Sequence, residues 1–252
     1  MEADATVAVM ADIHGNSWAL DAVLAEIDRR DIKRIVDLGD SLFGPLDPAG
    51  TANRLLERGI PSIRGNCERE LLEGFAQPED AHPTVTYTLA QLDVQHLRWV
   101  ESLPATRALT KLDILLCHGT PAKDDEYLLE QPVEAGGALL PDDEIAQRLT
   151  GTSAAVICCA HSHVPRLVLV AERHLVVNPG SVGCPAYRND LPAPHIMESG
   201  SPHARFAVLT RRHGGWTVEH LAVAYDWSAA AKAARSNGRP DWARAIATGR
   251  AP

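Results

Sequence analysis

The chain has 252 residues, of which 45% are hydrophobic and 23% charged, so it is long enough and apolar enough to bury one large core. Its formal net charge of −9 disfavours nonspecific binding to nucleic acid, although a bound metal ion could still attract a phosphate ester locally. We expect no membrane span and no secretory signal, and five cysteines without a disulfide pattern predict a reduced, cytoplasmic setting.

Strands and helices alternate in the first quarter of the chain. Short apolar runs rich in β-branched residues predict strands, and apolar residues at helical spacing predict helices. In chain order, these patterns predict strands over residues 7–11, 33–38 and 60–63, with helices over 18–29 and 51–58. Such β-loop-α repetition is typical of layered α/β proteins.

Two further parts of the chain are predicted to be helical. The segment at about 68–110 is amphipathic and is expected to cover one side of the candidate site. The tail from about residue 228 is rich in alanine and is expected to form helix. We predict one domain over residues 1–252.

Further strands are predicted between these helical parts. Apolar runs predict single strands over 112–117 and 154–159, and hairpins over 167–177 and 205–223. The second hairpin is expected to turn at His213, Gly214 and Gly215. Residues 187–201 are rich in Pro, Asn and Gly, which indicates a long loop of the kind that often lines a functional site.

Residue types that bind metals follow five of the predicted strands. They form the clusters Asp12-Ile13-His14, Gly39-Asp40, Gly65-Asn66-Cys67-Glu68, Cys117-His118-Gly119 and His161-Ser162-His163. Ligand sites of open α/β sheets gather beyond the carboxyl ends of the strands, and mixed carboxylate and imidazole ligands suit manganese, iron, zinc or nickel. A single Asp at a strand end is more often a turn or helix cap. Five such clusters in order favour a metal site.

The order D-x-H, G-D, G-N, H, H-x-H resembles the calcineurin-like metallophosphoesterase superfamily, and Gly65-Asn66-Cys67 resembles a group of its small bacterial phosphodiesterases. The resemblance implies an α/β fold, a four-layer α/β/β/α sandwich of two mixed sheets flanked by helices. It also implies two divalent metal ions, with manganese favoured and iron, zinc, nickel or magnesium as alternatives. Its implied ligands are Asp12, His14 and His163 for one ion, Asn66, His118 and His161 for the other, and Asp40 between the two.

The activity that the resemblance implies is hydrolysis of phosphate esters by in-line attack of a metal-bound hydroxide. We expect a phosphodiesterase acting on a small or nucleotide-type substrate, with Asn66 and Cys67 as catalytic residues. The alternatives are an asymmetrical dinucleoside polyphosphate hydrolase, a phosphomonoesterase, or a noncatalytic metal-binding module that retains the fold. No nucleic acid scaffold or membrane partner is expected, and the sequence leaves the oligomeric state open.

Cys67 departs from the superfamily pattern, in which many members have a histidine that is thought to protonate the leaving oxygen. A thiol is a poorer proton donor near neutral pH than an imidazolium. The sequence therefore predicts a preference for substrates with good leaving groups. A replacement of Cys67 by histidine is expected to help poor leaving groups most.

The arginines narrow the substrate class. Protein serine/threonine phosphatases have an arginine soon after the G-D motif, and none follows Asp40 here, so a protein phosphatase is disfavoured. Arg64 either contacts the substrate or is a surface arginine, and Arg188 in the predicted loop is a second candidate for a phosphate contact. The other histidines, among them His82 and His195, are interpreted as surface or structural residues.

Overall fold

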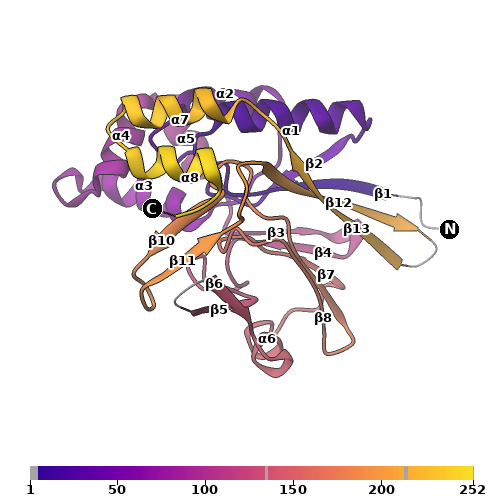
Figure 1. The fold of residues 1–252 in the computed structure, drawn as a ribbon. Coiled ribbons are helices and arrows are strands. Elements are labelled where there is room, and N and C mark those ends of the chain that lie inside the picture. The colour runs from indigo at the N-terminus through magenta and orange to yellow at the C-terminus, as the bar shows by residue number, and fades with distance from the viewer. Residues whose placement is uncertain (1–4, 134–135, 213–214, 252) are drawn as a thin grey trace.

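Two mixed β-sheets lie face to face, with helices on their outer sides, in the computed structural model of the protein (Figure 1). The structure describes residues 5–133, 136–212 and 215–251. This arrangement confirms the predicted α/β sandwich. The turn expected at His213 and Gly214 lies outside the described residues, as does the acidic start of the chain. No helix in these three ranges is long and apolar enough to cross a membrane.

The first sheet has four strands in the order β13-β12-β1-β2. Strand β1 is parallel to β2 and antiparallel to β12, which pairs in turn with β13. The strand bounds are β1 (Ala5–Met10), β2 (Arg34–Asp37), β12 (Ala204–Arg212) and β13 (Gly215–Val223).

The second sheet has five strands in the order β3-β4-β7-β9-β8. Its three central strands are parallel, and the two edge strands run antiparallel to them. The strand bounds are β3 (Thr106–Leu109), β4 (Ile114–Cys117), β7 (Val156–Cys158), β8 (Arg166–Val170) and β9 (His174–Asn178).

Strand β1 is buried on both faces because side chains alternate along a strand. Val7 and Val9 pack against the second sheet, in one core with Leu116 and Val177. Its other face, which includes Met10, packs against the helical layer. A continuous apolar run, rather than an alternating one, is what such a central strand requires.

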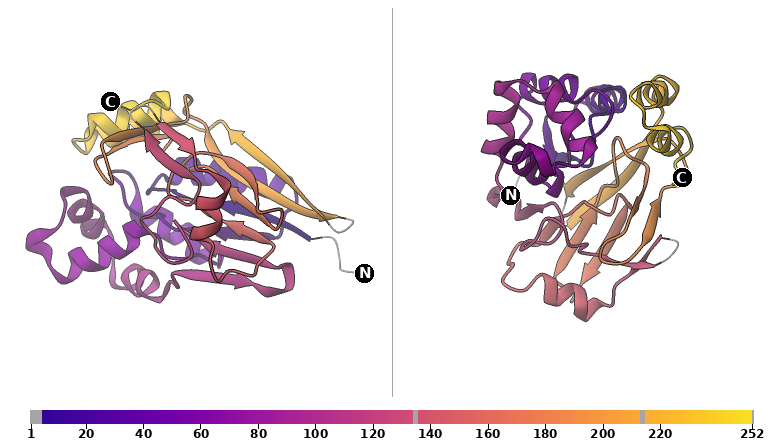
Figure 2. Two further views of the ribbon diagram at one scale, coloured as in Figure 1. Left: turned by 90° about the horizontal axis from the view of Figure 1, so that it is seen from below. Right: turned by 90° about the vertical axis from the view of Figure 1, so that its left-hand side faces the viewer.

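Helices cover both outer faces of the pair of sheets (Figures 1 and 2). On the first sheet, α1 buries Leu20, Val23 and Ile27, which recur at helical spacing, and its N-terminus is capped by Asn16. On the second sheet, α6 buries Ile145. The helices are α1 (Ser17–Arg29), α2 (Pro48–Glu57), α3 (Asn66–Ala76), α4 (Pro83–Gln91), α5 (Val94–Ser102), α6 (Asp142–Arg148), α7 (Trp227–Ser236) and α8 (Pro240–Thr248), with 3₁₀ turns η1 (Pro78–Asp80) and η2 (Thr110–Leu112).

Three predicted elements differ from the structure. Residues 60–63 make only one bridge, from Ser62 to Asp37, because Pro61 has no N–H with which to extend the pairing. The helical segment ends at Ser102 and is followed by strand β3. The predicted loop over 187–201 contains most of a hairpin.

Two hairpins stand apart from the main sheets. One joins β10 (Ala186–Asn189) to β11 (His195–Glu198), and the other joins β5 (Glu130–Val133) to β6 (Gly136–Leu139). Their polar and Pro-rich sequences lack the alternation by which a strand is predicted, so pairing across the chain decides their conformation. Helix α8 packs against α7 and reaches β10.

Candidate metal centre

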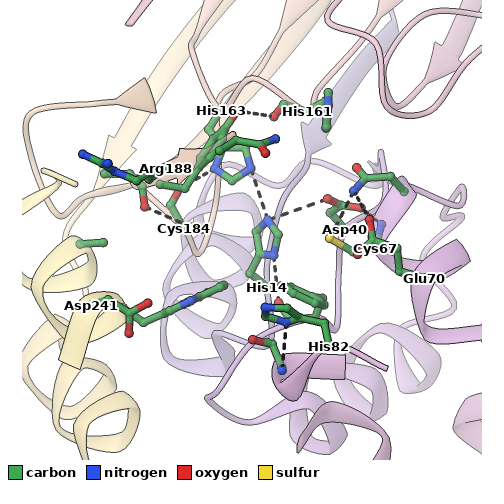
Figure 3. Close-up of a pocket in the computed structure, with 18 of the residues that line it drawn as sticks. His14, Asp40, Cys67, Glu70, His82, His161, His163, Cys184, Arg188 and Asp241 are labelled. Carbon is green, nitrogen blue, oxygen red and sulfur yellow. Dashed lines mark hydrogen bonds and ion pairs between the residues drawn. The ribbon is translucent and has the colours of Figure 1, made fainter. Parts of the chain in front are cut away.

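The seven predicted metal ligands meet at one edge of the two sheets. The first sheet contributes Asp12 and His14 after β1 and Asp40 after β2. The remaining ligands follow β4 and β7 of the second sheet or begin helix α3, and they are His118, His161, His163 and Asn66. Figure 3 shows His14, Asp40, His161 and His163 around one cavity. The centre therefore lies where the two sheets meet.

Carboxylate oxygens and imidazole nitrogens converge within this centre. His118 Nε2 lies 3.3 Å from Asp40 Oδ2 and 3.9 Å from Asp12 Oδ1. His163 Nε2 lies 3.4 Å from Asp12 Oδ1 and 3.3 Å from His14 Nε2. Potential ligand atoms of Asp40, His118 and His161 all lie within 4.8 Å of one another. These separations suit atoms that share a bound cation.

Backbone carbonyls orient three of the imidazoles. The Nδ1 atom of His14 lies 2.9 Å from the Phe43 oxygen, that of His118 2.8 Å from Leu38, and that of His163 2.7 Å from Cys184. Since a carbonyl only accepts hydrogen bonds, each Nδ1 donates its proton. Each Nε2 of a neutral ring is then left with a lone pair that faces the centre, as in metal-binding histidines.

Several buried polar atoms at this centre have no hydrogen-bond partner. They are Asp12 Oδ1 and Oδ2, Asn66 Oδ1 and His118 Nε2. An unpaired buried acceptor is costly, so these atoms suit the binding of a cation. Each of these three residues belongs to one of the two expected ligand sets, so bound divalent cations would satisfy all of these atoms. The side chains present therefore fit a metal.

The pKa shifts of two histidines agree with a cation-binding centre. Burial, together with the charge of the neighbouring His118, lowers the pKa of His161 to about 4, so its ring is neutral and free to coordinate. Burial also acts to lower the pKa of His118, but Asp40 and Asp12 outweigh it and raise the pKa to about 10. The two carboxylates thus favour a positive charge beside them.

The backbone is strained at the same residues. Asp12, His14 and Asp40 have φ angles of 54°, 52° and 54°, and His161 and His163 have φ angles of 67° and 59°. Residues other than glycine rarely adopt this left-handed region, and such strain clusters at functional sites. The strain turns each side chain sharply inward just after its strand.

Gly65 allows the close approach of the Asp40 loop. A Cβ atom at Gly65 would lie 2.1 Å from Asp40 Oδ1 and 2.8 Å from the Asp40 nitrogen. No larger residue fits there without moving Asp40. The glycine of the Gly65-Asn66 motif is therefore a steric requirement of the centre.

Glu68 holds the loop that carries Asp40. Its buried carboxylate accepts backbone N–H groups from Asp40 and Ser41 at 2.7 Å each, Gly65 at 3.0 Å and Leu42 at 3.3 Å. Burial raises the pKa of Glu68 to about 7, and the nearby Asp40 charge acts in the same direction. The sequence marks this residue only as an acidic neighbour of Cys67, and the structure shows what it positions.

The Asn178-Pro179-Gly180-Ser181 turn fastens two of the ligand loops. Asn178 Nδ2 donates to the Ala160 oxygen at 3.0 Å and to Ser162 Oγ at 3.1 Å. Ser181 Oγ donates to the Asp12 oxygen at 2.8 Å. The turn thereby connects the His161 loop to the Asp12 loop.

A buried network joins the β10–β11 hairpin to the centre. Tyr187 OH donates to the His161 oxygen at 3.1 Å and lies 2.8 Å from Tyr127 OH. The Tyr127 ring stacks on His161 with centroids 4.6 Å apart, and its hydroxyl lies 2.9 Å from His195 Nε2. His195 is thus structural, as its lack of motif context indicates. The tyrosines were missed because only the folded chain brings them to His161.

A cavity of about 540 Å³ opens beside the centre. Cys67 lines it, and burial together with the Asp40 charge raises the pKa of its thiol well above the usual value. Cys67 is therefore a protonated thiol and not a thiolate nucleophile. Arg188 lines the cavity as well, whereas Arg64 is not among the lining residues, and the backbone N–H of Arg64 donates to the Pro104 oxygen at 2.8 Å.

Comparison with known proteins gives one family and similar folds. The family model of the calcineurin-like phosphoesterase superfamily domain matches residues 6–196. A metallophosphoesterase from Sphaerobacter thermophilus is 22% identical, with a TM-score of 0.73 over 96% of this chain and 98% of that one. A hypothetical protein from Pyrococcus horikoshii OT3 is 20% identical, with a TM-score of 0.74 over 97% and 98%. At these identities the two structures show a shared fold.

A sequence relative spans the chain to a similar extent. An uncharacterized protein from Methanocaldococcus jannaschii is 24% identical over 259 residues, covering 94% of each chain. The family match ends before strand β12, so helices α7 and α8 lie outside it.

Proposed function

Because the chain belongs to the calcineurin-like phosphoesterase superfamily, a metal-dependent family of phosphoester hydrolases, we propose that it is a two-metal phosphodiesterase for small or nucleotide-type substrates. One observation carries this proposal. Carboxylate, amide and imidazole groups converge at one buried centre where Asp12, Asn66 and His118 have atoms without hydrogen-bond partners.

The ligands divide into two sets in this proposal. Asp12, His14 and His163 hold one ion, Asn66, His118 and His161 hold the other, and Asp40 lies between the two. Carboxylate and imidazole donors dominate both sets and suit manganese, iron, zinc or nickel, of which we propose manganese. Bound divalent ions would acidify a water molecule and neutralise phosphate oxygens.

Other side chains of the centre orient these ligands and the substrate. The carbonyls of Phe43, Leu38 and Cys184 fix three imidazoles, and Glu68 fixes the Asp40 loop. The Arg188 side chain lines the cavity, and no hydrogen bond or ion pair joins its guanidinium to another described residue. Its guanidinium is therefore available to bind a phosphate oxygen, a role for which Arg64 is less well placed.

Hydrolysis assays with an aryl phosphodiester and an aryl phosphomonoester test this proposal. We expect hydrolysis with added manganese, loss of activity on chelation, and faster turnover of the diester. The Asp40→Asn variant should lose nearly all activity and bind less metal by elemental analysis. The matched Asp31→Asn variant alters an exposed aspartate outside the centre and should retain both properties.

Each contrary result has a separate meaning. Faster turnover of the monoester would replace the phosphodiesterase by a phosphomonoesterase. Absence of hydrolysis with every divalent metal would favour a noncatalytic metal-binding module. Full activity of Asp40→Asn would rule out a bridging role for Asp40.

A further inference from the structure

Three aromatic side chains form a continuous wall of the cavity beside the metal centre. This aromatic wall consists of Phe43, His82 and Trp242, all of which line the cavity. The ring centroids of Phe43 and Trp242 lie 6.3 Å apart, and those of Phe43 and His82 lie 6.5 Å apart. The three residues come from the loop after Asp40, the start of α4 and helix α8, so only the folded chain assembles them.

The aromatic wall adjoins a proposed metal ligand. The ring of His14 lies 5.8 Å from that of Trp242 and 6.2 Å from that of Phe43, measured between centroids. Figure 3 shows His82 below His14, on the side of the cavity away from His163. Phe43 and Trp242 are half-buried and His82 is exposed, so all three rings are at least partly accessible. A group esterified to a phosphate at the metals could therefore reach the wall.

Polar groups border the aromatic wall. Arg239 lies over the Trp242 ring, 5.7 Å from its centroid, and donates to the Asp241 carboxylate at 2.6 Å. Arg239 also donates to Thr84 Oγ1. These contacts fix Arg239 and Asp241 beside the ring, where they present hydrogen-bonding atoms at the cavity. A ligand with both a flat apolar face and a polar edge matches this surface.

We propose that the aromatic wall binds the base of a nucleoside that is esterified to the phosphate. This inference deepens the proposed function and rests on it. Any nucleobase can stack on an aromatic side chain. The edges of nucleobases carry hydrogen-bond donors and acceptors that Asp241 and Arg239 can pair with. The cavity of about 540 Å³ is within the usual range for small-molecule sites. Arg188 remains available for a phosphate oxygen of the same substrate.

Phosphonates that the protein cannot hydrolyse test the inference by titration calorimetry on the manganese-loaded protein. The probes are an adenosine phosphonate, phenylphosphonate and ethylphosphonate, which share the metal-binding group. We expect the adenosine phosphonate to bind about ten-fold or more tightly than either of the others, a factor typical of base stacking. Trp242→Leu should remove most of this difference and leave ethylphosphonate binding unchanged.

Further variants keep the test decisive if Trp242→Leu does not fold. Trp242→Phe should retain most of the preference because it keeps an aromatic face. Phe43→Leu should weaken the preference, whereas the matched Phe75→Leu variant, in which the exposed Phe75 lies outside the cavity lining, should not. Thermal unfolding verifies that each variant is folded.

The outcomes separate this inference from the proposed function. Equal binding of the adenosine phosphonate and ethylphosphonate by an active enzyme would overturn the nucleoside site alone. Equal and tight binding of the adenosine and phenyl probes would show an aryl site in its place. A Trp242-dependent preference without any ester hydrolysis would retain the nucleoside site and overturn the proposed function.

Discussion

Cys67 determines how a leaving group can be protonated in the proposed reaction. The thiol lies at the start of α3 and lines the cavity, and its own N–H donates to Asp40 Oδ1 at 2.9 Å. Burial raises the pKa of the thiol, so the thiol keeps its proton near neutral pH. The pKa of an imidazolium lies nearer the working pH, which makes an imidazolium the better proton donor. The departure of Cys67 from the superfamily pattern therefore concerns protonation of the leaving group.

The Cys67→His variant tests this assignment. It should raise turnover of an alkyl phosphodiester by about 100-fold, the lower end of the range for general acid catalysis, and change an aryl diester little. The aryl substrate is the internal control, because its leaving group needs no proton. Equal effects on the two esters would show that residue 67 does not act on the leaving group.

Asp37 is a buried carboxyl group that makes stability depend on pH. Ser41 Oγ donates to Asp37 Oδ2 at 2.6 Å, while Oδ1 has no partner. Burial raises the pKa of Asp37 from 3.8 to about 7. The folded protein therefore holds a proton that the unfolded chain releases, so this stabilising contribution is complete below about pH 4 and is lost as the pH rises through about 7.

The Asp37→Asn variant removes this titration. Relative to the parent, its free energy of unfolding should increase by up to about 3 kcal/mol between about pH 5 and about pH 8, at about 1.4 kcal/mol for each pKa unit. Urea unfolding in the presence of a chelator measures the free energy of unfolding at each pH without a contribution from bound metal. Asp31→Asn, at an exposed position, is the control. Parallel pH profiles of variant and parent would contradict a raised pKa at Asp37.

The first turn of helix α3 holds the loop that carries Asp40. Glu68 in that turn accepts N–H groups from two separate loops, so the helix fastens the loop after β2 to the start of α3. A glutamine at this position has one acceptor oxygen, and its amide would face N–H donors.

We therefore expect Glu68→Gln to lower the free energy of unfolding by about 3 kcal/mol, because buried donors lose their partners. The variant should also bind less manganese, since the Asp40 loop is no longer held. Glu73→Gln on the exposed face of the same helix is the matched control. Unfolding in urea and elemental analysis measure the two effects. Unchanged metal content would limit Glu68 to a role in stability.

Local patterns predicted strand β1, which precedes Asp12, and helix α1, which follows His14. Helix α1 has Leu20, Val23 and Ile27 at helical spacing, and β1 is a continuous apolar run ending at Asp12, so both are visible without the fold. The β10–β11 hairpin was predicted as a loop, because its strands are short and polar and depend on tertiary contacts. Trp242 was missed for a related reason, since a predicted helix does not reveal which cavity it borders.

Both sheets contribute residues to the candidate metal centre. Asp12 and Asp40 follow strands of the first sheet, whereas His118 and His161 follow strands of the second. Bound ions would join these loops across the interface between the sheets. Metal binding should therefore stabilise the molecule as well as activate it.

Chelation should lower the melting temperature, and manganese should restore it. A ligand at about 100 times its dissociation constant stabilises by about 2.7 kcal/mol, which corresponds to a shift of about 5–10 °C for a chain of this size. Calorimetry measures the shift. His161→Asn should reduce it, whereas His203→Gln, away from the centre, should not. A melting temperature independent of metal would contradict the proposed linkage between sheets.

The left-handed backbone at Asp12, His14, Asp40, His161 and His163 limits how this centre could be moved to another protein. A designer who grafts only the side chains onto a different α/β scaffold would place them on relaxed strand ends, where they point elsewhere. The graft must copy the loops and their supports, Glu68 and Gly65 included, before any ligand is in position. The transferable unit is thus the set of strained turns with the contacts that hold them.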